Sequence, residues 1–116
     1  MVEASHSFSA YYKRAVSPLL VLAMLRERPM YGYEISSRIS AQSGGALALS
    51  VLYPVLFRLQ EQEFIAEDSC VIVDGRARSY YRITESGTEY LKKTLREYRE
   101  LDRLFSDITG EQDHEK

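Results

Sequence analysis

SVLYPVLFRLQEQEFI, residues 50–65, is the stretch that decides the fold. Its apolar residues recur at spacings of three and four, the pattern of a helix with one buried face. Ser50 is suited to cap such a helix, and Pro54 then lies just past the first turn, where little hydrogen bonding is lost. We therefore predict a helix over 50–62, about 20 Å long, whose inward face is Leu52, Val55, Leu56 and Leu59.

Ser17-Pro18 predicts the start of an earlier helix, because serine caps helices and proline suits the first helical position. LLVLAMLRE follows, and a helix that is apolar on most sides is normally buried. Pro29 ends this helix.

A second helix is predicted between that one and residues 50–65. In MYGYEISSRISAQ a tyrosine and two isoleucines are spaced by four and share one face. Gly44-Gly45 ends the helix, because glycine adopts the left-handed cap without steric cost. Gly32 is expected to allow close contact with the preceding helix.

A two-stranded hairpin is predicted after residue 65. CVIV at 70–73 is rich in β-branched residues, Asp74-Gly75 is a turn signal, and SYYRI at 79–83 is the return strand. A lone hairpin is marginally stable in water, so this one must lean on the helices, as a wing does.

A long final helix, capped by Thr84, carries an apolar stripe at steps of three and four that approximates a coiled-coil seam. Such a stripe needs a partner. We favour a second copy of the chain, helped by an amphipathic segment near the N-terminus, and the alternative is folding back on the same domain. The residues predicted to form the dimer contact are Phe8, Tyr12, Leu91, Leu95, Tyr98, Leu101, Phe105 and Ile108.

The predicted fold class is mainly α, or α+β: a winged helix-turn-helix with a two-stranded wing and a long C-terminal dimerisation helix. The length of 116 residues suits one domain, or one domain with an appended element. We divide the chain into an N-terminal arm or short helix (1–16), the winged helix-turn-helix domain (17–84), the dimerisation helix (85–109) and a disordered acidic tail (110–116).

Composition excludes several classes of protein. There is no apolar run long enough to span a membrane, no secretory signal is expected, and the lone Cys70 excludes an internal disulfide, so we expect a cytoplasmic protein. We find no catalytic triad, phosphate loop, dinucleotide fingerprint or Cys/His cluster with metal spacing. We therefore expect no enzyme activity, cofactor or metal site.

The order helix, turn, presented helix and hairpin suggests DNA binding. The net charge of −2 argues against it, but residues 75–82 carry three arginines and no acid. Arginine reads guanine, hydroxyl groups suit phosphates, and basic wing tips suit phosphates or the minor groove. Each of these roles has an alternative. Tyr31 and Tyr53 could instead fill the core. Arg58 could form an ion pair, and the arginines of the wing tip could simply be solvated. The predicted DNA-binding residues are Tyr31, Ser50, Val51, Tyr53, Arg58, Arg76 and Arg78.

With these pieces in place, the chain resembles the PadR-type family of winged helix-turn-helix transcriptional regulators, from about residue 18 to 105. It is most similar to the smaller subfamily with a single C-terminal dimerisation helix. The matching segments, in chain order, are YGYEI (31–35), LYP (52–54) with Leu56, Arg58 and Leu59, Gly75-Arg76, YYRITE (80–85) and Gly87.

Three positions depart from the family pattern. Glu63 stands where the family usually has glycine, which costs about 1 kcal/mol if the backbone there is left-handed. Gln60 stands where glutamate is typical. Ser50-Val51 replace the usual glycine and small or hydroxyl residue, which leaves the operator sequence open.

The resemblance implies a transcriptional repressor that binds double-stranded DNA as a homodimer. The two-fold symmetry of such a dimer predicts an inverted-repeat operator. It also implies a small aromatic or drug-like effector at the dimer interface. The competing hypothesis is a winged-helix protein-interaction module without specific DNA binding. The residues predicted to line an effector site are Phe8, Tyr12, Leu95, Tyr98 and Asp102.

Overall fold

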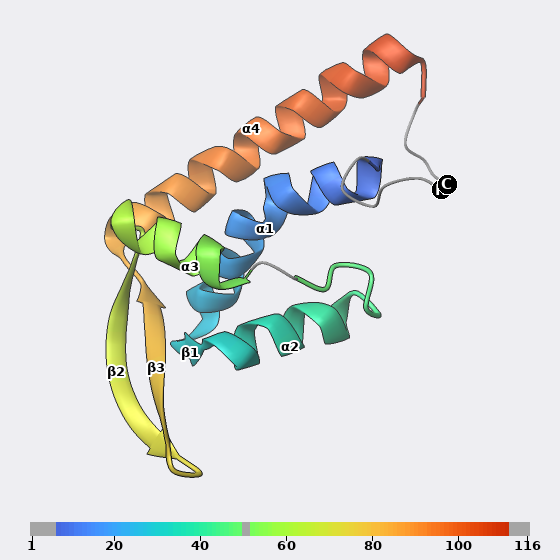
Figure 1. The fold of residues 1–116 in the computed structure, drawn as a ribbon. Helices are drawn as coiled ribbons and strands as arrows, with labels where there is room; N and C mark the ends of the chain where they lie inside the picture. The colour runs from blue at the N-terminus through green and yellow to red at the C-terminus, as the bar shows by residue number, and fades with distance from the viewer. Residues whose placement is uncertain (1–6, 50–51, 112–116) are drawn as a thin grey trace.

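Helices and a small antiparallel sheet build an α+β winged helix with one long C-terminal helix (Figure 1). The computed structural model describes residues 7–49 and 52–111. None of the helices in those two ranges is long and apolar enough to cross a membrane. The elements are α1 (Phe8–Glu27), β1 (Met30–Tyr31), α2 (Gly32–Gln42), α3 (Leu52–Glu61), β2 (Ile65–Val73), β3 (Arg76–Ile83) and α4 (Glu85–Thr109).

The predicted helix start at Ser17-Pro18 is wrong, because α1 is one helix of 20 residues that begins ten residues earlier, capped by the side chain of Ser7. Proline has no N–H, so Pro18 cannot donate the backbone hydrogen bond that the carbonyl of Arg14 would normally receive. The Oγ of the buried Ser17 donates to that carbonyl at 3.3 Å. The serine therefore compensates for the proline, and the helix continues.

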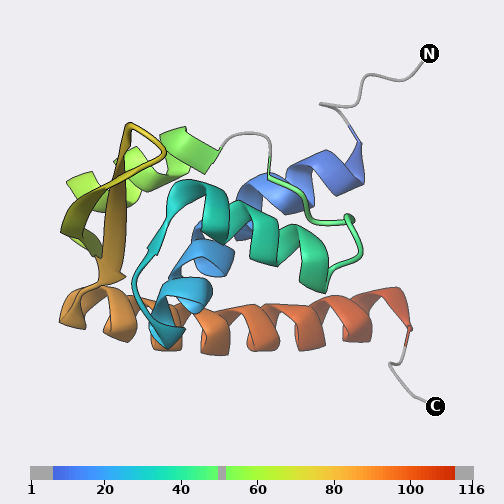
Figure 2. The same ribbon diagram turned by 90° about the horizontal axis from the view of Figure 1, so that it is seen from below.

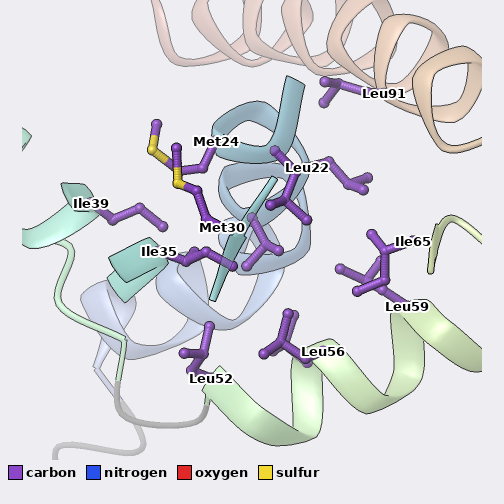
Figure 3. Close-up of a cluster of buried hydrophobic side chains, with 13 residues drawn as sticks. Leu22, Met24, Met30, Ile35, Ile39, Leu52, Leu56, Leu59, Ile65 and Leu91 are labelled. Atoms are coloured by element: carbon purple, nitrogen blue, oxygen red, sulfur yellow. The ribbon is translucent and has the colours of Figure 1, made fainter. Parts of the chain in front are cut away.

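One hydrophobic core joins α1 to every other element of the domain (Figure 3). Leu22 of α1, Met30 of β1 and Ile35 of α2 are fully buried, together with Ile65 of β2 and Leu91 of α4. The predicted inward face of α3 is confirmed, because all four of its members are buried in the same cluster: Leu52, Val55, Leu56 and Leu59.

The wing is a hairpin of β2 and β3 whose Asp74-Gly75 turn has positive φ at both residues, as type I′ turns require. The hairpin is longer than predicted. It also has a third strand that the sequence did not reveal, since the two residues of β1 pair with Tyr80 and Tyr81 of β3. The strand order is β1-β3-β2, and the wing extends away from the helices (Figure 1).

Helices α2 and α3 both end at residues with a left-handed backbone. Gly44 has a φ of 62° and ends α2, as predicted. At the end of α3 the amide of Phe64 donates to the carbonyl of Leu59, and that of Glu63 donates to Gln60. This is the Schellman pattern, and Glu63 occupies its left-handed position with a φ of 64°. The residue that replaces the family glycine is therefore strained.

The turn between α3 and β2 is tied to the first turn of α4. The hydroxyl groups of Thr84 and Ser86 donate to the carbonyl of Glu63, at 2.7 and 3.0 Å. The amide of Thr84 donates to the carbonyl of Phe64 at 3.0 Å. A Cβ atom at Gly87 would lie 2.1 Å from that same carbonyl oxygen, so only glycine fits there.

Long helix α4 then runs alongside α1 and past the end of the domain (Figure 2). Its second half presents apolar side chains to solvent, whereas Leu91 in its first half is buried.

Replacing Glu63 by Gly should raise the free energy of unfolding by about 0.5–1 kcal/mol, because the steric cost of a positive φ exceeds the extra flexibility of glycine in the unfolded chain. Urea unfolding at one protein concentration measures this. The control Glu61→Gly, at the last residue of α3, where φ is not positive, should lower stability by up to about 1 kcal/mol. A destabilised Glu63→Gly variant would contradict the assigned strain.

Gly87→Ala should lower the free energy of unfolding by about 2 kcal/mol or more, because the added methyl group collides with the backbone at Phe64. Alanine in an ordinary helix interior would instead stabilise by about 1 kcal/mol. Lys93→Ala, on the exposed side of α4, serves as the neutral control in thermal unfolding. A gain of stability in Gly87→Ala would mean that the close approach is absent.

Candidate nucleic-acid interface

The outward face of α3 carries two large rings. Tyr53 and Phe57 are 64% and 62% exposed, although the opposite face of the helix is buried. Arg58 is also exposed, on the other side of the helix from Tyr53. The remaining predicted residues of this stretch, Ser50 and Val51, lie outside the described residues.

A cleft of about 590 Å³ lies where the start of α2, the start of α3 and the wing meet. It brings together four of the predicted DNA-binding residues, although they are up to 47 positions apart in the sequence. Arg58 does not line it. The lining residues are Tyr31, Gly32, Tyr33, Tyr53, Arg76, Ala77, Arg78, Ser79 and Tyr81.

Gly32 and Tyr53 form the floor of this cleft. A Cβ atom at Gly32 would lie 2.8 Å from the Tyr53 hydroxyl. The missing side chain therefore makes room for α3, and the prediction that it makes room for the preceding helix is wrong. Because its ring is largely exposed, Tyr53 is not a core residue.

Arg78 and Tyr31 connect the wing to α2. The guanidinium carbon of Arg78 lies 4.7 Å from the centre of the Tyr31 ring, within cation–π range. Tyr31 also makes an edge contact with Tyr80, with ring centres 5.3 Å apart. The Nε of Arg78 is buried and has no hydrogen-bond partner within the part of the chain that the structure describes. Arg76, nearer the tip, is exposed.

The electrostatics of the cleft favour an anion. Tyr31 is the N-cap of α2 and makes no side-chain capping bond, so the positive end of this helix opens into the cleft. Burial, followed by Glu67 and Tyr53, raises the pKa of Tyr81. Its hydroxyl therefore stays protonated at neutral pH, and with the two arginines the cleft is lined by hydrogen-bond donors.

The exposed side of α4 forms a second candidate surface. Leu101, Phe105 and Ile108 are predicted dimer residues and are all exposed, as is Leu104, which the predicted stripe omitted. Leu91 was assigned wrongly to this contact. It is fully buried in the core of its own chain, because the first half of α4 covers the domain. Leu95 is half-buried against that core.

The predicted effector residues are brought together where α1 runs along α4. The hydroxyl groups of Tyr12 and Tyr98 lie 3.1 Å apart, and the rings of Phe8 and Tyr12 have centres 6.0 Å apart. The hydrogen bond to Tyr12, followed by burial and by the charges of Tyr12 and Asp102, raises the pKa of Tyr98 to about 12. Tyr98 is therefore uncharged at neutral pH.

Several residues of the interface were missed. Tyr33, Ser79 and Tyr81 line the cleft beside predicted neighbours, and the YGY motif is the signal that could have indicated Tyr33. Phe57 lies one helical turn after Tyr53, so the same spacing rule could have found it. Within residues 7–49 and 52–111, no group of three or more His, Cys, Asp or Glu side chains could hold a metal ion.

Comparison with known proteins agrees with this architecture. Residues 21–93 match the family described as "Transcriptional regulator PadR-like family". The transcriptional regulator Rv3488 of Mycobacterium tuberculosis is 31% identical over 103 residues, which cover 89% of this chain and 92% of that protein.

The solved structures that are similar to this chain include two that each have 26% sequence identity and a TM-score of 0.77. One is a transcriptional regulator from Clostridium thermocellum, with 84% of this chain and 96% of that chain covered. The other is a PadR family transcriptional regulator from Eggerthella lenta, with 85% and 86% covered. From its sequence match, its fold and its relatives, this chain belongs to the PadR-like family of transcriptional regulators and is not an enzyme.

Proposed function

We propose that this regulator is a homodimeric repressor that binds double-stranded DNA through α3 and the wing. The observation that carries the proposal is the cleft, in which two arginines, four tyrosines with exposed or half-buried rings and the positive end of α2 meet beside the exposed face of α3. Such a donor-rich surface suits backbone phosphates. Because DNA is the proposed partner, the cytoplasm is the proposed location.

The dimensions suit the major groove. The ten residues of α3 span about 15 Å, and the groove is about 12 Å wide, so one end of the helix can be engaged. With α3 in the groove, the wing lies along the flanking backbone. Arg76 then contacts phosphate directly. Arg78 holds the wing against Tyr31 and offers its remaining donors to the same strand.

The exposed apolar residues on the second half of α4 support a dimer. A contiguous face of Leu101, Leu104, Phe105 and Ile108 is costly to leave in water, and a second α4 would cover it. Two copies related by a two-fold axis present two α3 helices, so the operator is an inverted repeat with half-sites about one helical turn apart.

A small aromatic effector, if it acts on this chain, would bind beside Phe8, Tyr12, Leu95, Tyr98 and Asp102. Binding there would displace α4 relative to α1 and so change the distance between the two α3 helices. To do this, the effector must bind the DNA-competent and incompetent states with different affinities.

Replacing Arg76 and Arg78 together by Ala should weaken binding to a duplex selected from a random library by about tenfold or more. It should also reduce the slope of log K against log salt by about one to two. Fluorescence anisotropy over a salt series measures both. Arg99→Ala, on α4, is the matched control and should bind like the parent.

If the double variant keeps the parental affinity and salt slope, the wing assignment is wrong. If no duplex is enriched and no salt-dependent binding occurs, the chain acts instead as a protein-interaction module.

Leu101→Lys should convert the dimer to monomers, because it places a charge in the proposed apolar contact, where burial of an unpaired ammonium group is strongly unfavourable. Sedimentation equilibrium measures the change. Lys92→Glu lies on the opposite side of α4 and should leave the dimer intact. An unchanged dimer in Leu101→Lys would exclude this face as the subunit contact.

A further inference from the structure

Phe57 has no role in the fold or in the cleft. Its side chain is 62% exposed, and it lies on α3, the helix whose opposite face forms part of the core. Single exposed apolar residues are common on protein surfaces. Here, however, the exposed ring lies on the helix that the proposed function places in the major groove.

Helical periodicity places Phe57 near the centre of the outward face. Residues 52, 55, 56 and 59 are buried, and the side of the helix opposite to them carries Phe57 and Glu61. Tyr53 lies to one side and turns toward the cleft, where it contacts Gly32. A surface that approaches α3 directly would therefore meet Phe57 first.

Cationic groups flank Phe57 on both sides, which favours nucleic acid over a protein as the occupant of this face. Arg58 is exposed beside it, and the arginines of the wing and the positive end of α2 lie beyond Tyr53. The one acid on this face, Glu61, can accept a hydrogen bond from the amino group of cytosine. The face as a whole therefore suits base edges with phosphates on either side.

Phenylalanine has no hydrogen-bonding group, so it cannot distinguish the donor and acceptor patterns of bases. The apolar feature in the major groove is the C5 methyl group of thymine. We propose that Phe57 selects thymine in each operator half-site by contact with this methyl group. This specificity rests on the proposed insertion of α3 in the major groove.

The test uses the full-length protein and a duplex that the protein itself selects from a random library. Each thymine in turn is replaced by uracil, which removes only the methyl group and keeps the base pair. At the contacted position, uracil should weaken binding by the parent about fourfold, the effect of one buried methyl group. The same replacement in both half-sites should weaken binding by about sixteenfold.

Phe57→Ala should bind thymine and uracil duplexes equally at that position, whereas Phe57→Leu should keep part of the preference, because leucine still offers an apolar contact. Tyr11→Ala is the matched control, since it removes an exposed aromatic ring from α1, outside α3 and the wing, and should leave the thymine preference unchanged. Thermal unfolding of each variant should match the parent, because both side chains are exposed.

Salt-dependent binding without a uracil effect at any thymine overturns this inference and leaves the proposed function standing. A uracil effect that persists in Phe57→Ala also overturns it. If the protein selects no duplex and binds none in a salt-dependent manner, the proposed function fails, and this inference fails with it.

Discussion

The position of the proposed DNA-binding surface relative to the proposed dimer surface depends on a small group of hydrogen bonds at the end of α3. The carbonyls of Glu63 and Phe64 accept hydrogen bonds from Thr84 and Ser86, which form the first turn of α4. The stacked rings of Phe64 and Tyr90, with centres 4.4 Å apart, add to this junction. Because residue 87 is glycine, the backbone at the start of α4 lies close against the turn that follows α3. The helix proposed to bind DNA and the helix proposed to form the dimer are therefore in direct contact at this junction.

Helix α1 connects this junction to the rest of the domain. Its central part lies in the core, and its first two turns run beside α4 beyond the domain, where Tyr12 meets Tyr98. That continuity depends on the bond from Ser17 to the carbonyl of Arg14, which compensates for Pro18. A break at the proline would have separated an arm from the domain. The continuous helix instead joins the aromatic contact near the N-terminus to the core.

Most of the fold could be predicted, because its elements are marked by strong local signals. The buried face of α3, the Asp74-Gly75 turn and the glycine end of α2 are all local in origin, and all are present. The site was predicted less completely. Tyr31, Tyr53, Arg76 and Arg78 do meet in one cleft, but Tyr33, Ser79 and Tyr81 line it as well. The two-residue β1 strand was missed, since its pairing with Tyr80 and Tyr81 links segments about 50 residues apart.

The sequence by itself determined which residues share a helix face, where turns require positive φ, and hence the family. Only the tertiary structure decided what covers each face. Leu91 and Leu101 belong to the same stripe, yet the first is fully buried in its own core and the second is exposed, because α4 extends beyond the domain that it covers. Likewise, Arg76 and Arg78 are separated by a single residue on the wing but differ in their contacts, since only Arg78 reaches the Tyr31 ring. Periodicity is a property of neighbours in the chain, whereas burial depends on distant segments that meet only after folding.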